Sequence, residues 1–303
     1  MQIEEKYYTQ IKDYLIRNEI NHRIKDYSKN KGDLDTYYNI GKLLIEAQGG
    51  ERRAKYGDGL IKEYSKKLTL ELGKKFDTTT LKRMRQFYLI IQKGATLWHQ
   101  IPWSNYRELL SIKDINKVKY YIDLCIKLNL SNRKLREHIK NNDYERLDEN
   151  TKLKLIDDKE INIIDTVKNP IIISNSCSIK VYKEEILRKL ILEDLDNFLE
   201  ELGEGYHYVK TEYKIKIDNK YNSIDLLLYN KKFRCYVVIE LKIGELKKQD
   251  IGQIMIYMNY IDNNLKDNYD DKTIGMIICR KNNKNYIEYS SDPRIIAREY
   301  VIN

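Results

Sequence analysis

The segment from Tyr221 to Asp262 constrains the fold more than any other part of this sequence. It contains two apolar runs, centred on residues 226–228 and 236–239, with a polar break at residues 230–232 between them. This pattern predicts two β-strands joined by a tight hairpin. Both runs are apolar at consecutive positions, so both faces of each strand should be covered and the strands should lie in the middle of a sheet.

Three charged residues nevertheless lie within these runs or at their ends: Asp225, Glu240 and Lys242. Ionised side chains among Leu, Val and Ile are costly to desolvate unless they are paired or hold a metal. Alternate residues of a strand share a face, so Glu240 and Lys242 project together. A turn about residues 231–232 would place Asp225 opposite Val238, one position from Glu240 on the same face. The sequence therefore predicts a magnesium site beside a lysine, which is the equipment for hydrolysing a phosphodiester.

The Glu-x-Lys pattern on its own has little specificity. In this chain 33% of the residues are charged, and the pattern recurs at positions 4–6, 212–214 and 245–247. The copy at 240–242 differs because it ends an apolar strand and follows an Asp on the preceding strand. The alternative interpretation is an ordinary hairpin in which Glu240 and Lys242 form an ion pair at the strand end.

A helix is predicted over Leu246–Asp262, after Gly244 ends the second strand, because apolar residues recur there at intervals of three and four. Gln253 and Tyr257 are four residues apart and therefore share one stripe of this helix. From that stripe Gln253 would reach a phosphate or the water on the metal. The alternative is a solvated Gln on the edge of the helix.

Asp225, then Glu240-Leu241-Lys242, then Gln253 with Tyr257, together resemble the core of a PD-(D/E)XK nuclease. The surrounding segments IDLLLYN, RCYVVIELKIGE and YMNYID are similar to the YhcG-type family, bacterial proteins with a helical amino-terminal domain and such a nuclease domain behind it. The similarity spans most of residues 34–303. It implies an α+β two-domain protein, in which an all-α domain precedes an α/β domain of the restriction-endonuclease type.

The resemblance also implies a reaction, the metal-dependent hydrolysis of phosphodiester bonds in nucleic acid, first of all in DNA. Asp225 and Glu240 would bind Mg²⁺ or Mn²⁺, with the backbone carbonyl of Leu241 completing the ligand set. Lys242 would orient the attacking water and stabilise charge on the phosphate, and Gln253 would support the site from its helix.

The first helix of the nuclease core is predicted over residues 184–202. In the superfamily this helix often places a Glu near the metal, but the corresponding position here is Arg188, which departs from the pattern. Three acidic residues remain as substitutes, and the sequence does not choose among them: Glu184, Glu185 and Glu193.

Positive charge is concentrated in one stretch of the chain. The formal net charge is +9, and residues 51–94 contain 12 Lys and Arg against 5 Asp and Glu. A local surplus of this size favours an anionic partner such as nucleic acid.

Two helices are predicted within this stretch. The first ends at Gly73, and the second begins with Asp77 or Thr78 as its cap and runs to about Gln92. Such a pair indicates a helix-turn-helix-like unit that binds duplex DNA. The buried stripe of the second helix is predicted to comprise Leu81, Met84, Tyr88 and Ile91. The residues predicted to face outwards and contact DNA are Lys82, Arg83, Arg85 and Gln86. The alternative is a solvated basic face on a helical bundle.

These patterns predict three parts: a helical, basic, DNA-binding domain at 1–147, a linker at 148–168 and a nuclease domain at 169–303. Within the nuclease domain, further strands are predicted at 206–217, 273–279 and 285–289. The four Cys residues have no ligand spacing and no run approaches 18 apolar residues, so we expect a cytoplasmic protein without zinc or a membrane partner.

Two other functions stay open at this point. The first is a nucleic-acid-binding protein that does not cleave, which Arg188 in place of the helix Glu would favour. The second is an interaction module within a defence or restriction assembly, in which the basic helices dock an acidic protein. The choice among DNA, RNA and branched substrates is also open, as is the existence of a homodimer or a partner protein.

Overall fold

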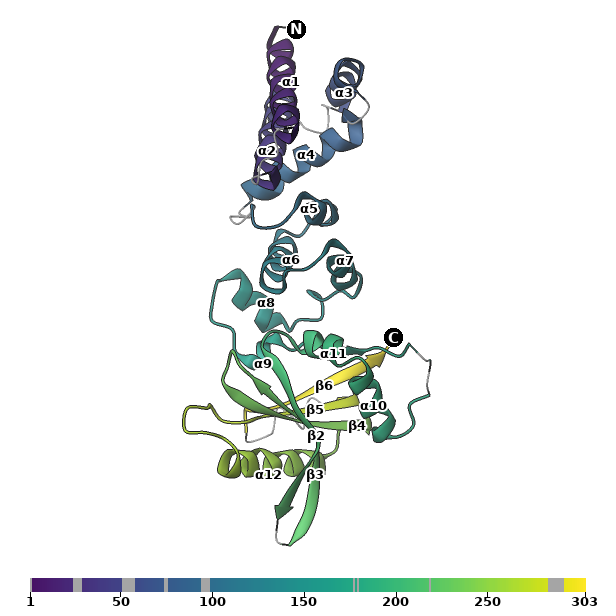
Figure 1. Ribbon diagram of the computed structural model, residues 1–303, viewed down its shortest axis with the longest axis vertical. Coiled ribbons are helices and arrows are strands. Elements are labelled where there is room, and N and C mark those ends of the chain that lie inside the picture. The colour runs from purple at the N-terminus through teal and green to yellow at the C-terminus, as the bar shows by residue number, and fades with distance from the viewer. Residues whose placement is uncertain are drawn as a thin grey trace. The chain divides into compact units, whose positions relative to one another are not determined.

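The computed structural model describes residues 2–23, 29–50, 58–73, 76–93, 99–176, 178, 180–217, 219–282 and 292–303. It divides into two compact units, Met1–Tyr144 and Glu145–Asn303. The first unit consists of helices, and the second combines a sheet with helices (Figure 1). The predicted α+β class, with an all-α unit preceding an α/β unit, is confirmed.

The helices of the first unit begin and end at residues that the sequence marks. Asp77 caps α4 by accepting a hydrogen bond from the Thr80 N–H at 2.7 Å. Gly73, with φ +104°, follows α3 in the left-handed conformation that favours glycine. The bounds are α1 (Gln2–Arg23), α2 (Lys29–Ala47), α3 (Asp58–Leu72), α4 (Thr78–Gln92), α5 (Trp103–Leu109), α6 (Ile115–Leu128) and α7 (Asn132–Lys140).

The buried face of α4 differs from the predicted stripe in its second half. Leu81 and Met84 are buried as expected, but Phe87 and Ile90 follow them in the core in place of Tyr88 and Ile91. Phe87 makes edge-to-face contacts with two aromatic rings of α5, those of Trp103 and Tyr106. The prediction was wrong because periodicity alone does not show where α5 packs.

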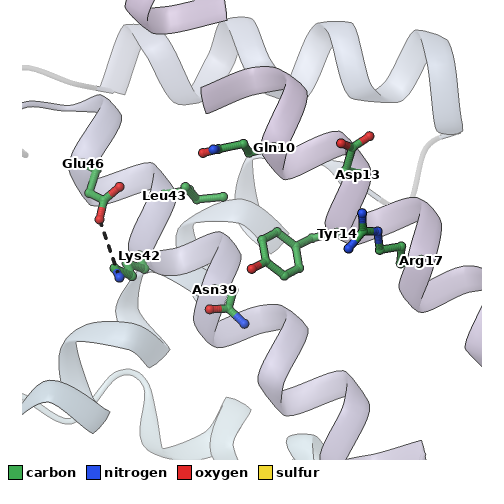
Figure 2. A pocket seen from close by; sticks show the side chains of 8 residues that line it. All are labelled: Gln10, Asp13, Tyr14, Arg17, Asn39, Lys42, Leu43 and Glu46. Carbon is green, nitrogen blue, oxygen red and sulfur yellow. Dashed lines mark ion pairs between the residues drawn. The ribbon is translucent and has the colours of Figure 1, made fainter. Parts of the chain in front are cut away.

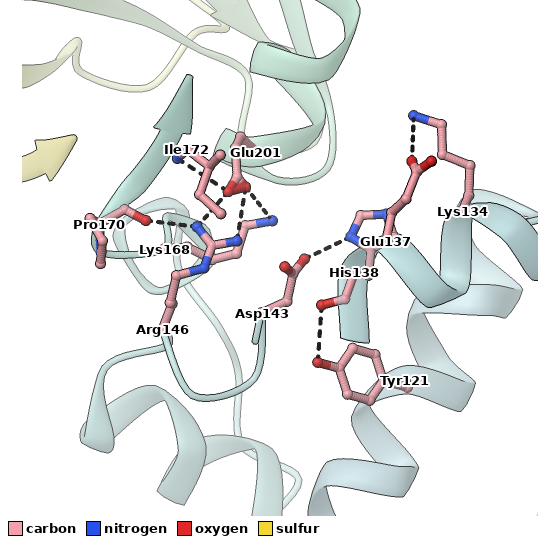
Figure 3. Close-up of polar contacts among 10 residues, drawn as sticks. All are labelled: Tyr121, Lys134, Glu137, His138, Asp143, Arg146, Lys168, Pro170, Ile172 and Glu201. Atoms are coloured by element: carbon pink, nitrogen blue, oxygen red, sulfur yellow. Dashed lines mark hydrogen bonds and ion pairs between the residues drawn. The ribbon is translucent and has the colours of Figure 1, made fainter. Parts of the chain in front are cut away.

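Helix α2 approaches α4 closely at Gly41. A Cβ at this position would overlap the Met84 carbonyl and the Tyr88 Cβ. Near the end of the same unit, buried His138 and Asp143 form a pair through Nδ1 and Oδ2 at 2.7 Å (Figure 3). The Tyr121 hydroxyl donates to the His138 carbonyl, so these polar groups tie α6 to the segment after α7.

The second unit contains a six-stranded mixed sheet in the order β1-β6-β5-β4-β3-β2. Strands β1, β6, β5 and β4 run parallel to one another, while β3 pairs antiparallel with both β4 and β2. The bounds are α8 (Glu149–Ile156), α9 (Ile163–Thr166), β1 (Ile171–Ile173), α10 (Glu184–Glu193), α11 (Leu195–Leu202), β2 (Tyr206–Ile217), β3 (Lys220–Asn230), β4 (Cys235–Glu245), α12 (Lys248–Asn264), β5 (Ile274–Lys281) and β6 (Ile295–Ile302).

Three details of this unit differ from the sequence prediction. The predicted helix over 184–202 is two helices, because the backbone at Asp194 (φ −129°, ψ 52°) leaves the helical conformation. The last described strand is β6, which the sequence analysis did not predict, and the strand predicted at 285–289 lies outside the described residues. Residues 148–168, for which a linker was predicted, contain α8 and α9.

Both faces of the central strands are covered, as their continuous apolar runs predicted. On one face, α10 and α11 pack through Leu187, Leu190 and Phe198 against a core that includes Leu226 and Leu228. On the other face, α12 packs against a separate core, whose members include Ile215, Ile224, Leu227, Val238, Ile254 and Met258. This burial holds β3 and β4 rigidly in the middle of the sheet.

A buried ionic cluster joins the start of the unit to α11 (Figure 3). Both oxygens of Glu201 accept hydrogen bonds from the Arg146 guanidinium, and the Lys168 Nζ lies 2.9 Å from Oε2. Arg146 also donates to the Pro170 carbonyl at 2.7 Å. The three charged side chains are less than a tenth exposed, so each depends on the others for compensation.

Among the helices that the structure describes, none combines the length and the apolar character that crossing a membrane requires.

Candidate active site

The site lies where β3 and β4 separate. Their ladder ends at the pair Leu226↔Ile239, and the next residue of β3, Asp225, accepts a hydrogen bond from the Leu241 N–H at 2.9 Å. The turn occupies residues 231–234, so Val238 pairs with Leu227 and not with Asp225 as predicted. The longer turn moves the register by two residues. Since side chains alternate with a period of two, Asp225 stays on the predicted face and comes closer to Glu240.

Glu240 is buried, with 3% of its surface exposed. Its Oε2 lies 3.5 Å from the Lys242 Nζ, and its buried Oε1 has no hydrogen-bond partner among the described residues. Burial, followed by the charge of Asp225, raises the pKa of Glu240 to about 8. A buried carboxylate with an unsatisfied oxygen is destabilising unless another group binds it.

Lys242 is surrounded by carboxylates. Burial alone would lower the pKa of its ammonium, but the negative charges of Glu240, Glu184 and Asp250 outweigh burial and raise the pKa. Lys242 therefore remains a cation at neutral pH. Its side chain is 18% exposed, which leaves one side open to an incoming group.

Helix α12 places Gln253 and Tyr257 beside these charges. The Gln253 Nε2 donates to the Tyr257 hydroxyl at 2.8 Å. Burial and the negative charge of Glu240 raise the pKa of Tyr257, so this hydroxyl stays protonated and lies within the field of the site. Gln253 is half-buried and reaches the cluster through Tyr257.

Arg188 of α10, the residue expected at the position of a helix Glu, also lies in the site. Its guanidinium donates to the Asp225 Oδ1 at 2.8 Å and to the Glu212 Oε1 at 3.0 Å. Glu212 has a φ of +49°, which is unusual for a residue other than glycine within a strand. Sequence reasoning noted Arg188 as a departure but missed this double ion pair, because Glu212 gives no apolar or spacing signal.

The three acidic residues of α10 lie in different surroundings. Glu184 is half-buried and contributes to the field around Lys242. Glu185 is exposed and pairs with Lys189 at 2.7 Å, and Glu193 is exposed. Glu184 is thus the member of this set that lies near the site.

The donor set fits a hard divalent cation in part. Within the described ranges, no three His, Cys, Asp or Glu side chains gather at one point. Asp225 and Glu240 supply two carboxylates, and the unpartnered Glu240 Oε1 is an open acceptor. Mg²⁺ is commonly held by one or two carboxylates together with water and substrate phosphates, so two are sufficient. Asp225 is engaged by Arg188, which a bound cation would have to displace.

The basic residues of α4 are less exposed than predicted. The four predicted DNA contacts, Lys82, Arg83, Arg85 and Gln86, are all half-buried. Arg85 donates to the Gln48 side chain at 3.3 Å, so it is directed into the helical unit. The sequence analysis did not anticipate this, because α2 covers part of α4. The basic residues at 52, 53 and 55 lie outside the described residues.

A groove of about 400 Å³ lies between α1 and α2 (Figure 2). Acidic, basic and amide side chains alternate along it, and Lys42 and Glu46 pair at 3.9 Å. The groove therefore has no single charge that would select a ligand. Its lining residues are Gln10, Asp13, Tyr14, Arg17, Asn39, Lys42, Leu43 and Glu46.

Solved structures similar to this chain include "crystal structure of a repair endonuclease from Pyrococcus abyssi", with 16% identity and a TM-score of 0.29 over 42% of this chain and 49% of that one. Another is "Structure of EndoMS-dsDNA2 complex", with 17% identity and a TM-score of 0.30 over 43% of this chain and 48% of that one. This chain covers about half the length of both.

Family models match both units. Residues 165–302 match the YhcG PDDEXK nuclease domain and residues 16–146 match the DUF1016 N-terminal domain. The chain is 27% identical over 307 aligned residues to the protein named "Putative nuclease YhcG" of Escherichia coli (strain K12), across 88% of this chain and 82% of that protein. The chain therefore belongs to the YhcG-type family, in which a DUF1016 N-terminal domain precedes a PD-(D/E)XK nuclease domain.

Proposed function

We propose that the carboxyl-terminal unit is a metal-dependent endonuclease that hydrolyses phosphodiester bonds in DNA. The observation that carries this proposal is the convergence of Asp225, Glu240 and Lys242 where β3 and β4 separate, with the Glu240 Oε1 buried and open. A structural ion pair alone would leave no reason to bury an acceptor without a donor.

Asp225 and Glu240, with the backbone carbonyl of Leu241, hold Mg²⁺ or Mn²⁺ in this proposal. Such a cation lowers the pKa of a bound water and neutralises charge on the phosphate. The Glu240 carboxyl, whose pKa burial raises to about 8, would have to give up its proton to hold such a cation, so binding would strengthen as the pH rises.

The other residues of the site position groups that the carboxylates do not reach. Lys242 is charged at neutral pH, and it stabilises negative charge on the phosphate and orients the attacking water. Gln253, held by Tyr257, presents its remaining amide groups to the same space. Arg188 neutralises Asp225 when no cation is bound and leaves Asp225 when one binds.

The helical unit holds duplex DNA in this proposal, through the basic residues of α4. All four residues are half-buried; Lys82 and Arg83 contact phosphates in this proposal, and Arg85 has to give up its hydrogen bond to Gln48 before it reaches a base beside Gln86. Replacing Lys82 and Arg83 with Ala should weaken duplex binding and make it less dependent on salt. The exposed, ion-paired Lys127 provides the matched control.

The test of the reaction is cleavage of supercoiled, linear and branched DNA and of an RNA, with Mg²⁺ or Mn²⁺ and with EDTA. We expect the wild-type protein to cut at least one of the DNA substrates when a metal is present. Glu240→Ala should not cut it. Equal cutting by both proteins would identify a contaminant and contradict the proposal. Tight, salt-sensitive binding without cutting would favour the second candidate, a binding protein whose Asp225 is permanently held by Arg188.

A further inference from the structure

Strands β2 and β3 continue beyond the rest of the sheet as a two-stranded ribbon (Figure 1). The pairing of β3 with β4 ends at Leu226, whereas its pairing with β2 continues to the pair Ile217↔Lys220. Residues 220–225 of β3 are therefore paired on one side only, and β2 is an edge strand of the described sheet.

One face of this ribbon belongs to the core. Ile215 and Ile224 are buried in the cluster that also contains residues of α12, and Tyr213 and Ile217 pack against it. This contact fixes the orientation of the ribbon, since the apolar face cannot turn to solvent without exposing these side chains.

The opposite face is exposed and carries positive and aromatic groups. Lys214 pairs with Ser223 and Lys216 pairs with Tyr221 across the two strands. Tyr221 is 74% exposed, and the Lys216 Nζ lies 6.0 Å from the centre of its ring. The feature that sets this ring apart is its company, because two exposed lysines lie on the same face of the ribbon.

This face leads directly to the candidate site. Tyr221, Ser223 and Asp225 are alternate residues of β3 and share one side of the strand. The acidic residue nearby on β2 is Glu212, and it accepts a hydrogen bond from Arg188. The ribbon face therefore presents two positive charges, those of Lys214 and Lys216, and Arg188 is shared by Glu212 and Asp225 where the face meets the site.

We propose that this exposed face, defined by Lys214, Lys216 and Tyr221, holds a single-stranded segment of nucleic acid on its way to the active site. The inference rests on the proposed nuclease function and extends it to the substrate. Lys214 and Lys216 bind successive phosphates, and the Tyr221 ring stacks on an unpaired base. Phosphate contacts and an exposed ring in line are the two elements by which proteins hold single strands without reading sequence.

A protein partner fits this face less well. An acidic peptide would use the lysines but would not require the exposed ring of Tyr221 beside them. A base in a blunt duplex is already stacked on its neighbours, so it would not gain from Tyr221. The geometry thus selects a strand with unpaired bases.

The test is fluorescence anisotropy of the full-length chain in EDTA, with labelled single-stranded and blunt duplex DNA, across a series of salt concentrations. Tyr221→Ala should weaken single-strand binding by about tenfold, and Tyr221→Phe should bind like the wild type because the ring remains. Lys214→Ala with Lys216→Ala should lower the slope of log Kd against log salt by about 1 to 2. The Tyr221→Ala effect should be smaller for the blunt duplex.

The controls change the same residue types elsewhere in the unit. Tyr269→Ala removes a ring that is 86% exposed, and Lys231→Ala with Lys272→Ala removes two exposed lysines; all three lie outside the ribbon. Ribbon variants that bind single strands as the controls do would overturn the inference, even if the wild type cleaves DNA. Ribbon-dependent binding by a protein that cuts nothing would support the inference and contradict the proposed nuclease function. An equal effect of Tyr221→Ala on duplex and single strand would refute the stacking role.

Discussion

Replacing Glu240 with Gln should stabilise the metal-free protein while abolishing its activity. In the folded chain burial raises the pKa of Glu240 from 4.5 to about 8. Above pH 4.5 the unfolded chain loses this proton and the folded chain keeps it, so wild-type stability falls as the pH rises towards 8 and then levels off. Gln carries no charge and does not have this loss.

The size of the effect follows from the same values. The interval between 4.5 and about 8 corresponds to at most about 5 kcal/mol, at about 1.4 kcal/mol for each pH unit. The Gln side chain would place an amide N–H group where the buried Glu240 Oε1 has no partner. This group costs roughly 1–3 kcal/mol if it finds no acceptor. A net gain of about 2–3 kcal/mol is therefore expected at pH 8, and a gain near zero or a loss at pH 5.

The assay is urea denaturation of wild type and Glu240→Gln in EDTA at pH 5, 7 and 8.5, followed by the same series with Mg²⁺. Mg²⁺ should stabilise the wild type and have much less effect on the variant, because binding to the folded state adds stability. Asp225→Asn is the contrasting variant. It should destabilise, since Arg188 then keeps a buried charge with a weaker acceptor. If Glu240→Gln were less stable than the wild type at pH 8.5, the description of Glu240 as a strained, unsatisfied carboxylate would be wrong.

Three further outcomes follow from other parts of the molecule. Glu201→Ala should lower the free energy of unfolding, measured by urea denaturation, by about 3–5 kcal/mol, because it removes the anion that Arg146 and Lys168 share in the core. The control Glu185→Ala changes an exposed residue and should alter the free energy of unfolding by less than about 0.5 kcal/mol. Equal effects of the two changes would contradict the account. Gly41→Ala should destabilise the helical unit by about 1–3 kcal/mol, since its Cβ would overlap the Met84 carbonyl; an unchanged midpoint would mean that α2 and α4 are not in close contact there. Arg188→Ala should tighten Mn²⁺ binding, measured by calorimetry, by about tenfold, because it removes a competing cation from Asp225; weaker binding would show that Arg188 supports the metal site instead.

The sequence predicted the central hairpin and its covered faces well because these depend on local apolar runs. Residues 226–228 and 236–239 are buried in a sheet that has helices on both faces. The predicted turn was too short by two residues, but because side chains alternate with a period of two, Asp225 and Glu240 still share one face. The cap of α4 was predicted to be Asp77 or Thr78 for the same reason, since capping is a local interaction, and Asp77 is the residue that caps it.

Features that depend on distant parts of the chain could not be predicted from these patterns. The contact between Arg188 and Asp225 joins residues 37 positions apart, and the Arg146–Glu201 cluster joins residues 55 positions apart. The shift from Tyr88 to Phe87 in the core of α4 depends on where α5 packs. Strand β6 was missed because Arg298 and Glu299 interrupt its apolar run, which is continuous in the central strands.

The most direct test of the central claim is the single-turnover rate of DNA cleavage with Mg²⁺ by Asp225→Asn, Glu240→Gln and Lys242→Met. Glu185→Gln and Lys189→Met serve as matched controls, because they change an exposed ion pair in the same unit. The account predicts that each of the first three variants loses at least about a hundredfold in rate and that the controls keep the wild-type rate. Wild-type rates in Glu240→Gln and Lys242→Met would contradict the claim that Asp225, Glu240 and Lys242 form the cleavage site.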